Sequence, residues 1–125
     1  MESHKLSFAE INILRHDIAE VKIYEGIEMD LLMVEQYHDF LLKHLIAPFA
    51  LLINKVNSYT YSFPAQVALA DLEEINAMAV VTYSNRAEVS TKYLTTIPRQ
   101  QPWNLTLFSR RDKALLWLEQ EQTKV

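Results

Sequence analysis

The sequence predicts an α/β fold, a mixed sheet with helices packed on it, and two observations lead to this prediction. In the first part of the chain, apolar residues alternate with polar ones at a period of two. Further along, three short apolar runs are separated by segments whose apolar residues recur at helical spacing. The alternation is typical of strands that bury one face, and continuous apolar runs are typical of strands covered on both faces. The predicted order is β-β-α-β-α-β-α-β-α, with an antiparallel hairpin first and parallel strands after it.

The hairpin and a long helix come first. Apolar and polar residues alternate over 9–13 and again over 19–23, with a turn at 15–17 between them. From 28 to 45 the apolar residues recur at helical spacing, which predicts an amphipathic helix. Its buried stripe is expected to consist of Leu31, Val34, Leu41 and Leu45, widened by Met33, Tyr37 and Phe40.

Two buried strands and a helix follow. Residues 49–53 and 76–83 are apolar almost throughout, which predicts strands covered on both faces. Between them, Ser62 precedes Phe63 and Pro64, and a proline in the first turn is typical of a helix start. The inward residues of this helix are expected to be Phe63, Val67, Ala70 and Leu72.

The last third of the chain predicts a helix, a strand and a closing helix. Ser84 and Asn85 are typical capping residues for a helix that ends at Thr95. Residues 105–108 form the last predicted strand, and Ser109 is the predicted cap of the closing helix. The inner faces of the two helices are expected to carry Val89, Tyr93 and Leu94, and Ala114, Leu115 and Leu118.

Composition excludes several classes of protein. A formal net charge of −4 with scattered basic residues argues against a nucleic-acid or anionic-membrane partner, since both need a basic face. The absence of cysteine excludes thiolate sites, and a single glycine excludes a glycine-rich phosphate loop. No run reaches the roughly eighteen apolar residues of a membrane span, and the N-terminus lacks a signal-peptide pattern. We expect a cytoplasmic protein without a membrane span.

The second half of the chain resembles a known family. The motif Ala-Met-Ala-Val-Val-Thr-Tyr at 77–83 is followed by Tyr93 and Leu94, and Leu107-Phe108 leads into Ala-Leu-Leu-Trp-Leu at 114–118. This pattern is similar to the STAS-like domains, typified by the sporulation anti-sigma-factor antagonist, and above all to a largely uncharacterised bacterial STAS/SEC14-like set. The resemblance spans nearly the whole chain and implies a single STAS-like domain over 1–125.

The regulatory site of these domains is only partly present. The regulatory STAS domains carry an aspartate after the third strand and a phosphorylatable serine in an Asp-Ser-Ser-Gly-like loop. On this chain the aspartate position falls at Asn54, the aspartates and the glycine of the loop are missing, and Phe63 occupies the phosphoacceptor position. Ser62, one residue away, is the candidate regulatory hydroxyl, and the alternative is a plain helix N-cap.

No residue pattern points to catalysis. Glu35 and His38 have the spacing of a metal-binding pair on one helix face, but a dinuclear site needs a second such pair, which the chain lacks. The serines occur in no nucleophile-elbow sequence, and the histidines have no obvious carboxylate partner. We therefore predict no enzyme, no catalytic residue, no metal and no cofactor.

Two functional hypotheses follow from the resemblance. The first is a binding or regulatory module that contacts an unidentified protein through the 57–62 loop and the next helix. Its candidate residues are Ser58, Tyr59, Tyr61, Ser62 and Phe63. The alternative is a carrier of a small apolar or lipid-like ligand, because aromatic residues near the carboxyl ends of strands are placed to line a pocket. The candidate pocket residues are Phe63, Tyr83 and Trp103.

The first predicted helix carries more apolar residues than one buried stripe requires. Leu32, Met33 and Leu42 broaden the apolar surface around the helix. Surplus apolar surface on a small domain indicates association. The sequence therefore also favours a homodimer through this helix.

Overall fold

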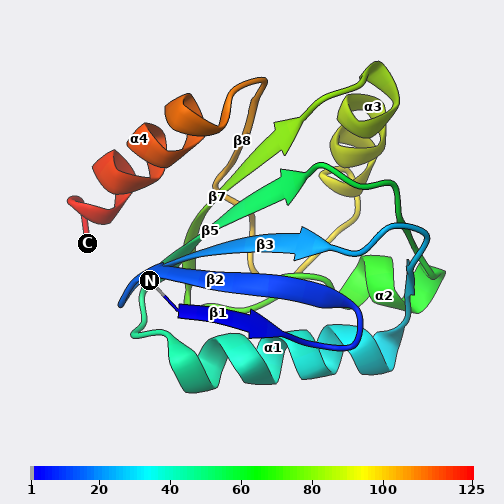
Figure 1. The fold of residues 1–125 in the computed structure, drawn as a ribbon, viewed down its shortest axis with the longest axis horizontal. Coiled ribbons are helices and arrows are strands. Elements are labelled where there is room, and N and C mark those ends of the chain that lie inside the picture. The colour runs from blue at the N-terminus through cyan, green and yellow to red at the C-terminus, as the bar shows by residue number, and fades with distance from the viewer. Residues whose placement is uncertain (1) are drawn as a thin grey trace.

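Helices cover both faces of a six-stranded mixed sheet in the computed structural model, which describes residues 2–125 (Figure 1). The sheet order is β1-β2-β3-β5-β7-β8, and the two-residue strands β4 and β6 pair separately. The elements are β1 (Glu2–Lys5), β2 (Ala9–Arg15), β3 (Ile18–Ile23), β4 (Glu28–Met29), α1 (Leu31–His44), β5 (Phe49–Lys55), β6 (Thr60–Tyr61), α2 (Phe63–Ala68), β7 (Ile75–Thr82), α3 (Asn85–Leu94), β8 (Leu105–Phe108) and α4 (Arg111–Gln122).

The strand directions confirm the predicted fold class. Strands β1, β2 and β3 pair antiparallel, and β3, β5, β7 and β8 pair parallel, each joined to the next through a helix. Strand β1 was not predicted, because its residues are polar and carry no apolar alternation. The pairs of β4 and β6 are likewise too short to leave a periodic pattern.

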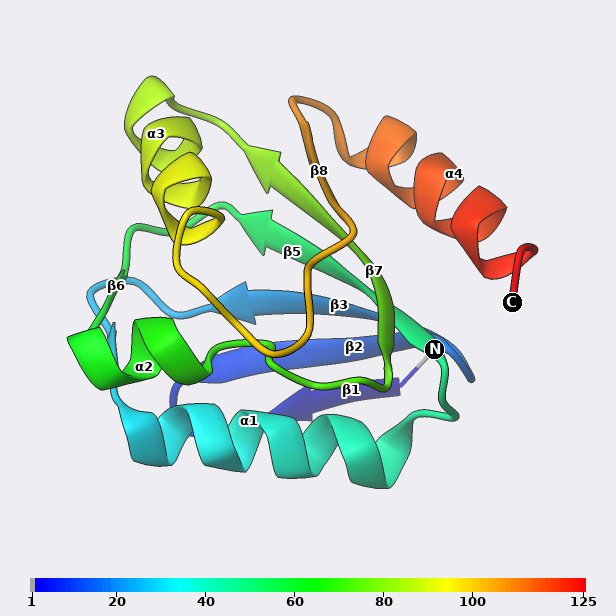
Figure 2. The ribbon, with the colours of Figure 1, turned by 180° about the vertical axis from the view of Figure 1, so that it is seen from behind.

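Two separate cores lie on the two faces of the sheet. The larger core packs β2, β3, β5 and β7 against α1, α2 and α3, with Phe8, Val34, Leu41, Leu51 and Met78 among its members. The smaller core packs the opposite side chains of β3, β5 and β7 against Ala114 and Leu118 of α4. Figures 1 and 2 show α4 apart from the other three helices. Strands β5 and β7 are buried on both faces, as their continuous apolar runs predict.

Helix α1 begins at Leu31, three residues after the predicted start at residue 28. Asp30 caps α1, since its Oδ1 accepts a hydrogen bond of 2.8 Å from the Met33 N–H, and the residues before it pair with β6 instead. The buried face is confirmed except at Leu31, which is 41% exposed, and Met33, which is partly buried. The other predicted residues of this face are buried: Val34, Tyr37, Phe40, Leu41 and Leu45.

The inner faces of α2 and α3 were predicted wrongly in part. Helix α2 ends at Ala68, so Leu72 lies beyond it, and Phe63 and Val67 face solvent. In α3, Val89 and Tyr93 are exposed, and Thr91 is buried beside Leu94. Burial of Thr91 is tolerated because its hydroxyl donates 2.8 Å to the Ala87 carbonyl of its own helix.

The closing helix begins one residue later than predicted. The residue at the N-cap of α4 is Arg110, not Ser109, and its side chain forms no capping hydrogen bond. Ala114 and Leu118 are buried as predicted, because they face the sheet from α4. Leu115 is partly buried against the same core.

Candidate functional site

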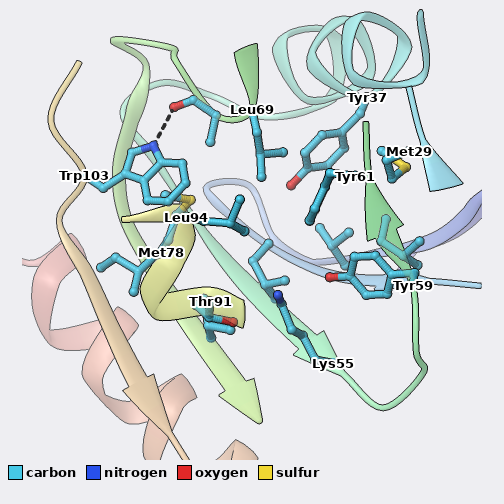
Figure 3. A pocket seen from close by; sticks show the side chains of 16 residues that line it. Met29, Tyr37, Lys55, Tyr59, Tyr61, Leu69, Met78, Thr91, Leu94 and Trp103 are labelled. Carbon is cyan, nitrogen blue, oxygen red and sulfur yellow. Dashed lines mark hydrogen bonds between the residues drawn. The ribbon is translucent and has the colours of Figure 1, made fainter. Parts of the chain in front are cut away.

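A small cavity lies on the face of the sheet that α1 and α3 cover. Its free volume is about 40 Å³, and sixteen side chains line it (Figure 3). They are Val21, Ile23, Met29, Tyr37, Ile53, Lys55, Tyr59, Tyr61, Leu69, Ala70, Met78, Val80, Thr91, Leu94, Trp103 and Leu105. A water-sized group needs about 10–15 Å³ of such volume, so the cavity holds about three of them. Its lining is apolar or aromatic except at Lys55 and Thr91.

Two tyrosines form the wall of the cavity between β5 and α2. Strand β6 is held against β4 by hydrogen bonds of 3.0 Å from the Thr60 N–H to the Ile27 carbonyl and 2.9 Å from the Ser62 N–H to the Met29 carbonyl. Alternate side chains of an extended segment point the same way, so Tyr59 and Tyr61 both face the cavity while Thr60 is exposed. Their rings meet edge to face with centroids 5.5 Å apart.

Arg99 holds the opposite wall in place. Its guanidinium donates to the carbonyls of Leu69, Leu94, Ile97 and Gln66, and it stacks 3.7 Å from the centroid of the Trp103 ring. The Trp103 indole N–H in turn donates 3.2 Å to the Ala70 carbonyl (Figure 3). One arginine thus ties the ends of α2 and α3 to the loop that carries Trp103.

Lys55 is the single charged residue among the sixteen that line the cavity. Its ammonium lies 5.4 Å from the centroid of the Tyr59 ring and forms no ion pair with any carboxylate of residues 2–125. Burial disfavours the charged form and lowers the pKa of Lys55 to about 8. An anion that entered the cavity would therefore stabilise the charged form of Lys55.

The Tyr59 hydroxyl is buried without a partner. The Tyr61 hydroxyl is near it, but no group of the described residues meets the geometry of a hydrogen bond with it, and it is the one buried side-chain polar atom of residues 2–125 in this condition. Burial raises the pKa of Tyr59 and raises that of Tyr61 to about 12, so both phenols stay protonated at neutral pH. The Tyr59 hydroxyl is therefore a free hydrogen-bond donor at the cavity.

A wider cleft of about 500 Å³ adjoins the cavity at the carboxyl ends of β3, β5 and β7. Lys55 and Tyr59 line both spaces, so their side chains lie at the boundary between the cavity and the cleft. Gly26, in the left-handed region with φ of 78°, turns the chain after β3 so that its N–H donates 2.8 Å to the Ser58 carbonyl. The ends of parallel strands are where open α/β sheets bind ligands.

Comparison with known proteins supplies the fold family. No family model and no curated protein matches the chain at a significant level. A solved structure does match: the crystal structure of an uncharacterised protein of the DUF3478 family from Shewanella loihica, described as having a SpoIIAA-like fold. The two are 20% identical with a TM-score of 0.60, over 94% of this chain and 99% of that one. This chain has a SpoIIAA-like fold. The resemblance to STAS-like domains is thereby confirmed at the level of the fold.

The SpoIIAA-like fold places the predicted partner-binding residues in three different settings. Tyr59 and Tyr61 line the cavity, and Ser58 is exposed at the cleft. Ser62 is the N-cap of α2, where its Oγ accepts a hydrogen bond of 3.3 Å from the Ala65 N–H. Phe63 follows at the first helical position and is 70% exposed.

The three predicted pocket residues are likewise separated. Trp103 lines the cavity and Tyr83 lines the cleft, whereas Phe63 lines neither space, because its side chain leaves α2 toward solvent. The sequence reasoning missed Lys55 and Arg99. A lysine at the end of a strand and an arginine in a loop carry the usual pattern of solvated residues, and only the tertiary contacts distinguish them.

A polar network occupies the opposite face of the sheet. Glu20 is 2% exposed and accepts hydrogen bonds of 2.7 and 3.0 Å from the Arg111 guanidinium and 2.8 Å from the Asn54 amide. The Tyr83 hydroxyl donates 2.7 Å to Asn54 Oδ1. Burial acts to raise the pKa of Glu20, but the hydrogen bonds from Arg111 and Asn54 outweigh it and the pKa is lowered. Asn54, at the position where the regulatory STAS domains carry an aspartate, thus has a structural role, because it links Glu20 to Tyr83 by hydrogen bonds.

His38, which has the spacing of a metal-binding pair with Glu35, makes a structural hydrogen bond. No group of three or more histidine and carboxylate side chains suited to a metal ion occurs among residues 2–125. His38 Nε2 instead accepts a hydrogen bond of 3.0 Å from the Ala70 N–H, and burial lowers the pKa of its imidazole. In the same described part of the chain, no helix is long and apolar enough to cross a membrane.

Proposed function

We propose that the protein is a non-enzymatic module that binds a small, largely apolar molecule in the cavity beneath Tyr59 and Tyr61. The observation that carries this proposal is an apolar cavity that shares Lys55 and Tyr59 with a wider cleft at the carboxyl ends of the strands. Ligand sites combine such an apolar lining with a few polar groups that fix orientation. Here Lys55 and the Tyr59 hydroxyl are the polar groups.

The cavity is bounded by residues that the fold holds firmly on most sides. Four strands supply the floor, and Trp103 is anchored through Arg99 and the Ala70 carbonyl. Tyr59 lies on a longer connection between β5 and α2, next to the cleft. A ligand therefore enters from the cleft past Tyr59, and the fixed walls select it by size.

Methionine methyl groups provide the test. Met29 and Met78 line the cavity, whereas Met33 packs elsewhere in the same core. With methyl-¹³C-labelled methionine, titration with 1-butanol as a neutral probe is expected to shift the NMR signals of Met29 and Met78 in a saturable way and to leave Met33 unchanged. If the three signals moved together, or none moved, the proposal would be contradicted.

A second candidate function, contact with a protein partner, is supported by the exposed face of α2. Phe63 and Val67 are four residues apart, so they are neighbours on one helix face, and they are 70% and 41% exposed. Exposed apolar neighbours of this kind are typical of a contact surface. The test compares proteins retained from native lysate by the wild type, by an F63A/V67A double variant and by a V89A control. A partner that the double variant retains equally well would contradict this function.

The exposed leucines of α1 support self-association as a further proposal. Leu31, Leu32 and Leu42 are 41%, 62% and 43% exposed. We expect a dimer in light scattering at high protein concentration, and Leu32→Glu is expected to return the monomer. A monomeric wild type at every concentration would contradict a dimer through this helix.

A further inference from the structure

The free Lys55 ammonium at the mouth of an apolar cavity is an unusual feature for a structural residue. A charge near apolar surroundings is destabilising unless it is paired or hydrogen-bonded. Lys55 has no such partner among residues 2–125, and the neighbouring Tyr59 hydroxyl has none either. Figure 3 shows the two groups pointing into the same space. Two adjacent donors therefore lack an acceptor at the point where the cavity meets the cleft.

We propose that the ligand of this site is a small monocarboxylate with a short hydrocarbon chain. One carboxylate oxygen accepts from the Lys55 ammonium and the other accepts from the Tyr59 hydroxyl, while the chain fills the cavity. This inference rests on the proposed function and names the chemical class of the ligand.

The number of charges favours a monoanion. Lys55 supplies one positive charge at the cavity, so a single carboxylate neutralises it, whereas a phosphate dianion leaves excess charge next to apolar walls. A phosphate also needs several backbone N–H donors, and the chain has no glycine-rich loop to supply them. Glu25 is the acidic residue that lines the cleft, and its carboxylate accepts a hydrogen bond of 3.0 Å from the Ser58 N–H.

The volume of the cavity limits the length of the chain. About 40 Å³ accommodates roughly three water-sized groups, so beyond the carboxylate the ligand carries about three or four carbons. Butyrate and isovalerate fit this limit. A long fatty-acid chain does not, because its remaining methylene groups stay in the water of the cleft and gain nothing from burial.

Charged and titratable groups from several elements face Lys55. Tyr59 lies beneath the ammonium, Tyr37 and Tyr61 line the cavity with it, and Glu25 and Arg86 line the cleft. The phenols are neutral at physiological pH because burial raises their pKa values. A bound carboxylate favours the charged form of Lys55, so binding is accompanied by proton uptake near pH 8.

The experiment uses the whole chain and a defined set of probes. Affinities for acetate, butyrate, isovalerate and octanoate are measured by methionine-methyl NMR, together with those for butyramide and 1-butanol as neutral isosteres. We expect butyrate and isovalerate to bind most tightly, and Lys55→Met to weaken them about tenfold or more while leaving 1-butanol within about twofold. Lys43→Met removes the same charge from the exposed side of α1 and is expected to change neither.

A direct titration keeps the inference testable even if Lys55→Met fails to fold. The pKa of the Lys55 ammonium, followed by lysine side-chain NMR in the wild type, is expected to rise from about 8 toward the usual value of about 10.4 when butyrate saturates the site. An unchanged pKa under saturating butyrate would overturn the inference.

The outcomes separate the inference from the proposed function. If the neutral isosteres bind as tightly as the carboxylates and Lys55→Met affects both classes equally, the monocarboxylate inference fails and the cavity function stands. If no probe of either class shifts Met29 and Met78, both fail.

Discussion

Replacing Tyr59 with phenylalanine removes a buried hydroxyl that no group of residues 2–125 pairs with, and we expect the variant to be more stable than the wild type. Burying a polar group without a hydrogen bond costs about 1–3 kcal/mol, which the substitution recovers. The hydroxyl leaves behind roughly 10–15 Å³ of extra cavity, which at about 24 cal/mol per Å³ costs about 0.3 kcal/mol. The net expectation is a gain of about 1 kcal/mol or slightly more.

Urea unfolding at pH 7, followed by circular dichroism, measures this gain. A stabilisation of about 1 kcal/mol raises the urea midpoint with an unchanged slope and raises Tm by about 3–5 °C. Tyr83→Phe is the matched control, because its hydroxyl donates 2.7 Å to Asn54, which is 5% exposed. That variant leaves a buried acceptor unpaired and is expected to lose about 1 kcal/mol. A Tyr59→Phe variant that is destabilised like Tyr83→Phe would refute the reasoning.

Three further predictions concern residues around the site. Arg111→Ala leaves the buried Glu20 carboxylate with Asn54 as its remaining partner and is expected to cost about 2 kcal/mol in urea unfolding, a value reduced because Arg111 is 43% exposed. Because the pKa of Glu20 is lowered from 4.5, its contribution is complete above pH 4.5 and is lost as the pH falls through the folded-state pKa. Burial lowers the pKa of His38 from 6.5 and outweighs the charges of Asp39 and Asp71, which act to raise it. The unfolded state therefore binds more protons below pH 6.5, so the stability of the protein is expected to fall there. In thermal unfolding, His38→Gln is expected to show a weaker dependence on pH. Arg99→Ala removes donors from four carbonyls and is expected to lower Tm by several degrees and to quench or shift Trp103 fluorescence, with Arg99→Lys intermediate.

Each of these has a contrary outcome. A wild-type level of stability in Arg111→Ala would mean that solvent replaces the guanidinium at Glu20. Equal pH profiles for the wild type and His38→Gln would show that His38 does not cause the pH dependence of stability. Unchanged tryptophan fluorescence in Arg99→Ala would show that Trp103 is held by other contacts.

Sequence periodicity was sufficient for five of the six strands of the main sheet, and it missed the polar strand β1. Strands β5 and β7 are buried on both faces, so their apolar runs are continuous, and β2 alternates because one of its faces meets the core. Strand β3 also alternates in sequence, but its polar Glu20 is buried because Arg111 and Asn54 pair with it. Helix faces were harder to predict. Thr91 is buried and Val89 is exposed, although hydropathy alone ranks these two residues the other way. The burial of Thr91 is tolerated because its hydroxyl donates a hydrogen bond to the Ala87 carbonyl.

The site was predicted only in part for a physical reason. Tyr59 and Tyr61 turn inward because two-residue strands 32 residues apart in sequence pair with each other, and such short pairs leave no periodic signal. Trp103 was identified because large aromatic side chains beside strand ends are usually buried. Lys55 could not be recognised, since its environment is defined by side chains from seven other helices and strands and not by its neighbours in sequence.

The most direct test of the central claim is a crystal of the protein pressurised with xenon. Xenon occupies apolar cavities that are empty and accessible, and it needs no particular ligand chemistry. The account predicts a xenon atom bounded by Met78, Leu94, Tyr59 and Trp103, reached from the cleft beside Lys55. Side chains that fill this space, with xenon bound only elsewhere, would contradict it.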